Sequence, residues 1–199
     1  MDTCKVMSIS SFSLNGVVGE MLTYSDLVEK LIMTNSLSIL DEMDEDDAAM
    51  MRQLLSYQEG TAGALMTPDI IVLGPNATVA EALAHIRDPE WLVSIAAQVF
   101  VTNPPFRAPT GRYLGVVHFQ RLLREPPSME LGRCLEQEPT VTVDMPDREV
   151  AEVLASYNMM AMGVCDSAQR LLGAITVDDV LDRTLPADWR QRRRQVAPK

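Results

Sequence analysis

The chain has 199 residues, of which 47% are hydrophobic, and its formal net charge is −11 at pH 7. This length and apolar content suffice for one ordinary domain, or two small ones, with a buried core. The acidic charge argues against general nucleic-acid binding, because phosphate recognition depends on clustered lysine and arginine. An acidic surface instead favours cations as partners.

The apolar segments are too short to cross a membrane. The longest nearly uninterrupted one, residues 91–101, contains Ser94 and Gln98. It falls well short of the ~20 residues that a membrane-spanning helix requires. The first residues are rich in serine and lack the apolar core of a secretory signal. We therefore expect a cytoplasmic location.

The three cysteines, Cys4, Cys134 and Cys165, lie far apart and form no Cys-x-x-Cys pair. With only two histidines, His85 and His118, to join them, a zinc site or a disulfide framework is not expected. Neither histidine has a serine, cysteine or acidic partner at a telling spacing. No catalytic nucleophile and base emerge, and we expect that the chain is not an enzyme.

Charge is unevenly distributed at the two ends of the chain. Residues 1–56 form an N-terminal segment in which we expect an amphipathic helix at 44–55 and a further helix around 27–33. The tail, residues 186–199, is rich in arginine. Such a tail is typical of a solvated terminus, and contact with an anionic lipid or partner surface is the alternative.

An internal repeat is the most informative feature of the sequence. Three pairs of segments match: Pro75 with Pro146, residues 79–83 with 150–154, and residues 114–117 with 172–175. The interval between the second and third matches is longer in the first copy. Its stretch 103–111 contains prolines and a glycine that cannot continue a helix or a central strand. We interpret this stretch as an inserted surface loop.

Each copy reads as strand, helix, strand, strand, helix. A β-rich run, at residues 70–73 and again at 140–143, precedes a helix whose apolar residues recur every three or four positions. One or two strands and a closing helix follow. The expected architecture is α+β, with the copies at 61–129 and 130–185. Because each copy is too small to cover both faces of its sheet, we expect pseudo-twofold packing with a cleft between the copies.

Helix starts are also marked in the sequence. Thr78 and Glu81 have the spacing of a capping box for the first helix of copy one. Asp147, just after Pro146, is expected to cap the corresponding helix of copy two. Both predictions concern the position where the β-rich run gives way to a helix.

The second copy ends in Gly173-Ala-Ile-Thr-Val-Asp-Asp179, ahead of its closing helix. This Gly-x-x-Thr-x-x-Asp pattern, with the repeated element order, resembles the cystathionine-β-synthase (CBS) domain pair throughout residues 61–185. Residues 54–68, Leu-Leu-Ser-Tyr-Gln-Glu-Gly-Thr-Ala-Gly-Ala-Leu-Met-Thr-Pro, are similar to the junction between the N domain and the CBS pair of MgtE-type magnesium transporters. Residues 176–182, at the end of the second copy, are similar to the same family.

The resemblance to the MgtE family implies a cytosolic homodimer that binds Mg²⁺ through acidic residues and holds the transport pore closed when magnesium is plentiful. Some members also bind ATP in the CBS cleft. The sequence departs from this family in two respects: residues 1–56 correspond to a shortened N domain, and no transmembrane region follows. We expect that this chain does not transport magnesium by itself.

Thr176 and Asp179 are the principal candidates for a nucleotide site. In similar CBS pairs the threonine hydroxyl reaches a phosphate and the aspartate accepts the ribose hydroxyls, with help from the helix N-terminus. Thr140, Val141 and Met162 would then lie along the adenine of the bound nucleotide, AMP or ATP. A Thr-x-x-Asp helix start is also a capping box that needs no ligand, and a row of methionines is typical of an adaptable core.

Copy one provides an internal comparison. It has His118 and Arg121 at the positions equivalent to Thr176 and Asp179. The fold therefore does not require the Thr and Asp pair. We call the surroundings of His118 the first half-site and those of Thr176 the second half-site, and we expect the first to be altered or empty.

A magnesium site is expected from carboxylates alone, because Mg²⁺ keeps several waters and takes only one or two protein carboxylates. Asp178 and Asp182 share a helix face. Asp44, Asp46 and Asp47 could be held near them across a domain interface, where a bridging cation would relieve like-charge repulsion. The alternative is that acidic residues in a first helical turn merely complement the helix dipole.

Two functions from different classes remain open at this point. The first is a regulatory CBS pair of MgtE type, a homodimer that senses Mg²⁺, adenine nucleotide or both. Its partner would be a membrane transporter or the transmembrane region of its own longer chain. The second is a ligand-free scaffold whose dimer and arginine-rich tail recruit a partner.

Overall fold

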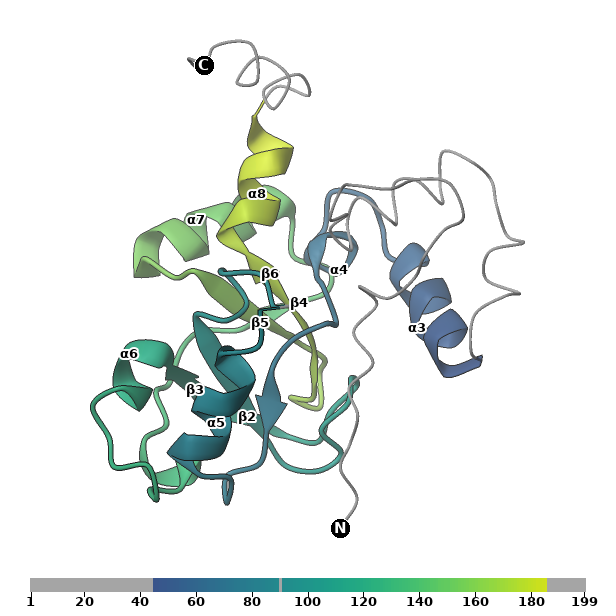
Figure 1. Ribbon diagram of the computed structural model, residues 1–199. Helices are drawn as coiled ribbons and strands as arrows, with labels where there is room; N and C mark the ends of the chain where they lie inside the picture. The colour runs from purple at the N-terminus through teal and green to yellow at the C-terminus, as the bar shows by residue number, and fades with distance from the viewer. Residues whose placement is uncertain (1–44, 90, 186–199) are drawn as a thin grey trace, which may run out of the picture.

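The computed structural model describes residues 45–89 and 91–185 (Figure 1). The helices are α3 (Glu45–Leu55), α4 (Ala62–Leu65), α5 (Val79–Ile86), α6 (Phe119–Leu122), α7 (Asp147–Tyr157) and α8 (Val177–Thr184), with a 3₁₀ turn at Leu131–Arg133. The strands are β1 (Val72–Leu73), β2 (Gln98–Thr102), β3 (Tyr113–His118), β4 (Val141–Thr142), β5 (Ala161–Cys165) and β6 (Leu171–Thr176). Within residues 45–89 and 91–185, no helix combines the length and hydropathy needed to cross a membrane.

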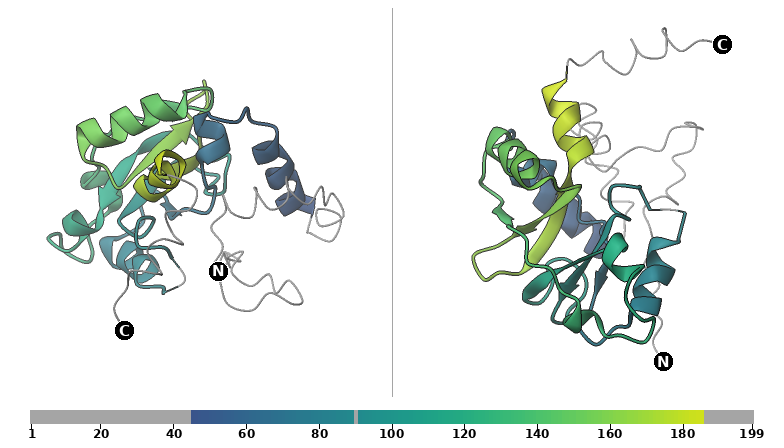
Figure 2. Two further views of the ribbon diagram at one scale, coloured as in Figure 1. Left: turned by 90° about the horizontal axis from the view of Figure 1, so that it is seen from above. Right: turned by 90° about the vertical axis from the view of Figure 1, so that its left-hand side faces the viewer.

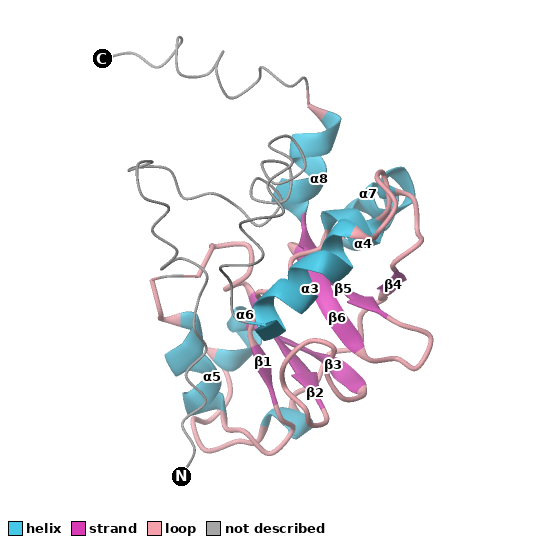
Figure 3. Cartoon of the chain, turned by 90° about the vertical axis from the view of Figure 1, so that its right-hand side faces the viewer, coloured by secondary structure: helices cyan, strands magenta, loops and turns pink. Residues whose placement is uncertain are grey.

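Two small sheets with the same topology form the centre of the molecule. In the first sheet β1 runs parallel to β2 and β2 antiparallel to β3, and β4, β5 and β6 repeat this arrangement. Helices α5 and α6 lie on one side of the two sheets and α7 and α8 on the other (Figures 2 and 3). The predicted α+β fold, with β-α-β-β-α repeated, is confirmed. The first strand of each repeat is shorter than its β-rich run predicts.

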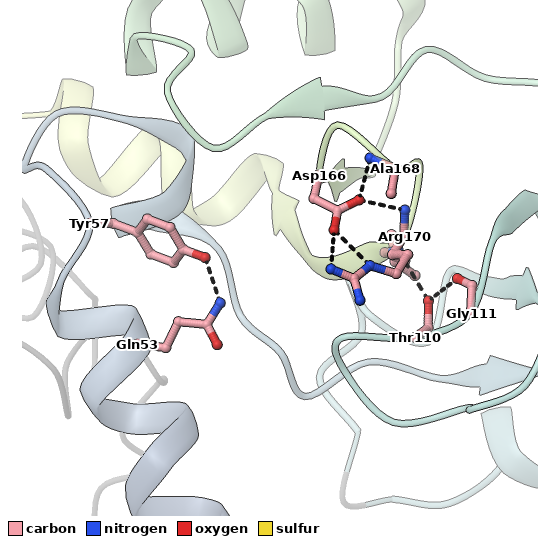
Figure 4. A network of polar contacts seen from close by, with 8 residues as sticks. Gln53, Tyr57, Thr110, Gly111, Asp166, Ala168 and Arg170 are labelled. Carbon is pink, nitrogen blue, oxygen red and sulfur yellow. Dashed lines mark hydrogen bonds and ion pairs between the residues drawn. The ribbon is translucent and has the colours of Figure 1, made fainter.

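A pseudo-twofold axis passes between the β2–β3 and β5–β6 hairpins. Arg112 and Arg170, which are equivalent residues of the two repeats, form an isolated antiparallel bridge with each other. The Leu171 N–H donates to the Thr110 hydroxyl at 3.1 Å. Beside this contact, the Asp166 carboxylate accepts hydrogen bonds from Arg170 and from the N–H of Ala168 (Figure 4). The two hairpins are thereby held together at their turns.

The faces of the two sheets that meet are complementary in size. Phe100 of β2 is fully buried, and the equivalent position in β5 is Gly163. A Cβ atom on Gly163 would lie 3.5 Å from the Phe100 ring. Next to them the Gln98 side chain donates from Nε2 to the Ala161 carbonyl at 3.2 Å. A large residue in one repeat thus faces a missing side chain in the other, which brings the sheets close together.

In each repeat, the segment that precedes the first strand pairs with the last strand of the other repeat. Thr67 exchanges two backbone hydrogen bonds with Ala174 of β6, at 2.8 and 2.9 Å. Glu136 makes the equivalent pair with Val116 of β3, at 3.0 and 2.8 Å. Because Thr67 and Glu136 each precede the first strand of their own repeat and pair with the last strand of the other, the two repeats are tied together by backbone as well as by side chains.

The N-terminal part of the described chain packs on the second repeat. The N–H groups of Ala62 and Gly63 donate to the carbonyls of Met145 and Val143 at 2.8 and 2.9 Å. Leu54 of α3 is buried in the apolar cluster of the second repeat. Helix α4 is therefore attached to the β4–α7 connection, and α3 packs on the apolar cluster of the second repeat.

The helix-start predictions had mixed outcomes. The capping box of Thr78 and Glu81 is present, with the Glu81 carboxylate accepting from the Thr78 N–H at 2.6 Å. The prediction for Asp147 is wrong, because Pro146 occupies the N-cap of α7 without a side-chain cap. The Asp147 N–H instead donates to the Gly60 carbonyl at 2.9 Å, so backbone from the incoming chain replaces a capping side chain.

Some expectations concern residues whose structure is not described. The proposed helix at 27–33, the arginine-rich tail at 186–199 and Cys4 lie outside the described residues. The amphipathic helix expected at 44–55 is α3. The inserted loop at 103–111 contains no helix or strand, as predicted. Cys134 and Cys165 are buried free thiols.

Candidate functional site

The second half-site lies where β6 ends and α8 begins. Thr176 is the N-cap of α8, and its hydroxyl accepts a hydrogen bond from the Asp179 N–H at 3.2 Å. In return the Asp179 Oδ2 atom accepts from the Thr176 N–H at 2.9 Å and from the Thr176 hydroxyl at 2.7 Å. The capping box that the sequence offered as an alternative to a nucleotide site is therefore complete without a ligand.

The environment of this capping box is nevertheless unusual. Burial raises the pKa of the Asp179 carboxyl; the Thr176 hydrogen bonds lower it, and the nearby charges of Asp178 and Asp182 raise it further. At the exposed α5 box, hydrogen bonds from Thr78 instead lower the pKa of Glu81. Capping alone does not require a half-buried carboxylate, because the capping box of α5 is also complete and its Glu81 is exposed. Asp179 carries a desolvation cost that a ligand donor would offset.

The unused hydrogen-bonding capacity of the pair lies on Asp179. Both contacts from Thr176 go to Oδ2, and within the described chain the Oδ1 atom accepts no hydrogen bond. The Thr176 hydroxyl, in contrast, already uses its single hydrogen toward Asp179 and is only 3% exposed. It would have to release Asp179 before it could donate to a phosphate. Asp179 is therefore better placed than Thr176 to receive a ligand hydroxyl or amine.

The residues proposed to lie along an adenine are mostly interior. Val141 and Met162 are buried in the apolar cluster of the second repeat. Thr140 is half-buried and its hydroxyl hydrogen-bonds the Cys165 thiol, whose pKa is raised to about 11, mainly by burial. Met160, in contrast, is exposed, and its carbonyl accepts the Val177 N–H at 2.9 Å at the start of α8. Met160 is therefore an exposed methionine whose backbone adjoins the start of α8.

The carboxylates expected to bind Mg²⁺ are only partly described. Asp178 is exposed and Asp182 is half-buried on α8, close enough to Asp179 to raise its pKa. Asp44 lies outside the described residues, as do the side chains of Asp46 and Asp47. Within the described part of the chain, no group of three or more His, Cys, Asp or Glu side chains could hold a metal ion. The magnesium site stays a prediction.

The first half-site has the same backbone and different chemistry. His118 is the N-cap of α6, and its Nε2 atom lies 2.8 Å from Glu138 Oε1. The backbone N–H of His118 donates to Glu136 Oε2 at 3.2 Å. The sequence shows no acidic partner for His118 at a telling spacing, and the structure supplies one in Glu138. The spacing gave no signal, because the pairing of Glu136 with Val116 brings Glu138 to the histidine from 20 residues away.

Two pockets open on the described surface away from Thr176. One, of about 240 Å³, lies between α3 and the inserted loop, and its lining includes Leu54, Arg107 and Leu172. Leu172 precedes Thr176 by four residues, or about 13 Å along a strand. The other is lined by Glu59, Gly60, Asp147 and Arg183. Neither pocket is the second half-site, and the cleft expected there stays a prediction.

Comparison with known proteins agrees with this architecture. The model of the CBS domain family matches residues 62–128 and 134–185. The magnesium transporter MgtE of Thermus thermophilus is 30% identical over 143 residues, which cover 71% of this chain and 31% of that protein. MgtE of Enterococcus faecalis is 27% identical over 138 residues, covering 69% of this chain and 29% of that protein. The chain thus spans only about 30% of the length of these relatives.

Solved structures are similar over more of their length. The cytosolic domain of the Mg²⁺ channel MgtE in complex with ATP superposes with a TM-score of 0.68 at 27% identity, covering 80% of this chain and 64% of that one. The soluble part of a magnesium transporter gives a TM-score of 0.70 at 24% identity, covering 80% and 62%, and shows a shared fold. The chain belongs to the CBS domain family, as a CBS pair homologous to the cytosolic region of MgtE magnesium transporters.

Proposed function

We propose that this chain is a regulatory module of MgtE-type magnesium transport, which senses adenine nucleotide, Mg²⁺ or both and signals by rearrangement of its domains. It acts as a homodimer at the cytoplasmic side of a membrane. Its partner is a transporter or the transmembrane region of its own longer chain. The proposal assigns ligand binding to the chain and no catalysed reaction.

The observation that carries the nucleotide part is the half-buried carboxylate of Asp179, which has one oxygen without a hydrogen-bond partner in the described chain. Oδ2 accepts both Thr176 hydrogen bonds, while Oδ1 has no partner in the described chain. A ribose offers two adjacent hydroxyl donors, which suit a half-buried carboxylate with one oxygen that no group of the described chain occupies. The relative solved with ATP supports an adenine nucleotide as the ligand class.

The magnesium part of the proposal rests on the acidic start of α8. Asp178, Asp179 and Asp182 place three carboxylates within the first two turns, and their mutual repulsion contributes to the raised pKa of Asp179. Such a helix start would repel the phosphates of a free nucleotide. A magnesium ion bound by Asp178 and Asp182, or carried by the nucleotide, would remove this repulsion. We therefore expect Mg²⁺ and nucleotide to favour each other's binding.

Helix α8 also offers a route from the ligand to the rest of the module. Its first residue follows Thr176, and near its end Arg183 lies 3.8 Å from Glu59. Glu59 immediately precedes Gly60, which accepts the Asp147 N–H. A ligand that shifts α8 would thus act on the junction between α3 and the CBS pair. It can do so only by binding the two arrangements with different affinities.

A ligand-free scaffold is the second candidate function, and one observation favours it. The capping box of Thr176 and Asp179 is complete by itself, with contacts of 2.7, 2.9 and 3.2 Å. In that case the CBS pair would serve dimerisation and recruitment of a partner. The buried charge of Asp179 would then be a cost without a ligand to offset it.

Calorimetric titration of the full chain with ATP, AMP and Mg²⁺ separates the two functions. The proposal expects saturable heat with at least one nucleotide, and a Thr176→Ala/Asp179→Ala variant should weaken that binding at least tenfold. Thr78→Ala/Glu81→Ala, at the exposed capping box of α5, is the matched control and should leave affinity unchanged. No heat from any ligand, with unfolding unaffected by Mg²⁺, would establish the scaffold instead. Equal binding by the first variant would refute the site.

A further inference from the structure

The two half-sites can be compared residue by residue, because their backbones are equivalent. The strand registers pair His118 with Gln98 and Thr176 with Ala161. The residue after each N-cap donates its N–H to a carbonyl at the same place in the neighbouring connection, at 3.0 Å in the first repeat and 2.9 Å in the second. Any difference in ligand binding must therefore come from the side chains and from the helices that follow them.

In the first half-site, a side-chain pair fills the position that the Thr176 hydroxyl has in the second. The imidazole of His118 contacts Glu138 at 2.8 Å, and the two side chains are only 25% and 19% exposed. The chain fixes Glu138 there, since Glu136, two residues earlier, is bonded to β3 through its backbone and accepts the His118 N–H. In the second half-site, the residue equivalent to Glu138 is Asp69, which makes no ion pair within the described chain.

The other ligand group of the second half-site is also replaced. Arg121 stands where Asp179 would accept ribose hydroxyls, and an arginine has no acceptor atom. Its Nε is held by Glu125 at 2.8 Å. Helix α6 spans Phe119–Leu122, four residues, against eight in α8, so its N-terminus attracts an anion less. Glu138 and Glu125 thus pair with the two basic side chains of the first half-site, which leaves neither His118 nor Arg121 available to hold a phosphate.

We propose that the His118–Glu138 pair closes the first half-site, so that each CBS pair binds one nucleotide, at Asp179. His118 is then a specificity-determining residue that excludes nucleotide from its own repeat. This inference rests on the proposed nucleotide function and adds its stoichiometry. The hydrogen bond that His118 makes to Glu138 also raises the pKa of His118, so the contact favours the protonated imidazole.

Calorimetry and equilibrium dialysis of the full chain with ATP and AMP, with and without Mg²⁺, test the inference. The expected result is one nucleotide per chain, abolished by Thr176→Ala/Asp179→Ala and unchanged in affinity by His118→Ala. Two nucleotides per chain, or an affinity at least tenfold weaker in His118→Ala, would overturn the inference and leave the proposed function standing. No binding of either nucleotide would overturn both.

Transplanting the second half-site into the first provides the complementary test. His118→Thr/Arg121→Asp/Glu138→Asp gives the first half-site the same three side chains as Thr176, Asp179 and Asp69. This variant should bind a second nucleotide, with an affinity within about a hundredfold of the first. Far-ultraviolet circular dichroism establishes that it is folded. A folded variant that still binds one nucleotide would show that these side chains are not what closes the half-site.

Discussion

Asp179 and Glu81 close capping boxes of the same design, yet the pKa values of their carboxyls shift in opposite directions. The exposed Glu81 gains from its hydrogen bonds to Thr78 without losing much hydration. The half-buried Asp179 loses part of its hydration, and its two contacts from Thr176 do not fully compensate. A residue kept ionisable at a cost to the fold is a stronger indication of ligand binding than the Thr-x-x-Asp pattern itself.

Replacing Asp179 by Asn should therefore not destabilise the ligand-free protein. The Asn oxygen still accepts from Thr176, and no charge is buried. Because the folded-state pKa of Asp179 lies above its ordinary value of 3.8, wild-type stability falls as the pH rises from that value through the folded pKa. We expect Asp179→Asn to unfold at pH 7 at an equal or higher temperature than the wild type. Asp179→Ala, which loses the cap, should cost about 1 kcal/mol.

Glu81→Gln is the control for this comparison. Its carboxylate has a lowered pKa, so it stabilises the fold above pH 4.5 and the amide should be slightly less stable than wild type at pH 7. Thermal unfolding followed by circular dichroism measures all three variants. If Asp179→Asn is as unstable as Asp179→Ala, burial of the Asp179 charge is not the cost inferred from the structure.

His118 should make stability fall as the pH rises, which is the same sense as for Asp179 and the opposite of that for Glu81. Its folded-state pKa is raised above 6.5, first by the Glu138 hydrogen bond, so the stabilisation is fully present below pH 6.5 and is lost as the pH rises through the folded value. For a partly buried, charge-assisted contact the loss should be about 1 kcal/mol. Urea unfolding at pH 6 and pH 8.5 measures it. Glu138→Gln should remove the difference, whereas His85→Gln, at an exposed helix position, should retain it.

At the scale of elements, the glycine of the Gly-x-x-Thr-x-x-Asp pattern has a structural role. A Cβ on Gly173 would lie 2.5 Å from the Thr67 carbonyl oxygen, and one on Gly115 would lie 2.8 Å from that of Glu136. Each glycine thus permits the close approach of the segment that pairs with its strand. The same requirement in both repeats explains why the glycine recurs while the ligand residues differ.

Gly173→Ala should consequently disrupt the pairing of Thr67 with Ala174. The clash involves backbone that cannot rotate away, and we expect a loss of about 2 to 3 kcal/mol in the free energy of unfolding by urea. Gly74→Ala is the control, because its Cβ would meet only the ring of the exposed Phe106, and it should cost less than about 1 kcal/mol. Equal losses in the two variants would contradict the role assigned to Gly173.

The sequence predicts the elements better than their contacts. Period and repetition reveal the order of strands and helices and the capping box at Thr78, because these depend on neighbours in the chain. Asp147 was misassigned because the carbonyl that satisfies its N–H belongs to Gly60, far away in sequence. Glu138 was missed as the partner of His118 for the same reason. Contacts made between the repeats leave no local pattern.

At the scale of the whole molecule, the two repeats share one folding unit. The apolar cluster of the first repeat includes Cys165, Leu171 and Ala174 of the second. The pairing of Thr67 with Ala174 closes the second sheet with a segment that leads into the first. Neither repeat therefore has a complete core or a complete sheet without the other, which favours a single cooperative transition.

This shared unit predicts that damage in one repeat destabilises both. Val101 and Val164 occupy equivalent, fully buried positions opposite Gly115 and Gly173. Truncation of either to Ala should cost about 2 kcal/mol. In a Trp189→Phe background, fluorescence reports on Trp91, which packs against the first core, while circular dichroism reports on both repeats.

With either valine truncated, the urea midpoints from fluorescence and circular dichroism should remain coincident and shift together, because unfolding of one repeat exposes the core of the other. A Val164→Ala variant in which Trp91 keeps the wild-type midpoint while the circular dichroism transition splits would show independent repeats. In that case a ligand at Asp179 would not act on the first repeat through the shared core, and the Arg183–Glu59 contact would remain as the route from α8 to the N-terminal helices.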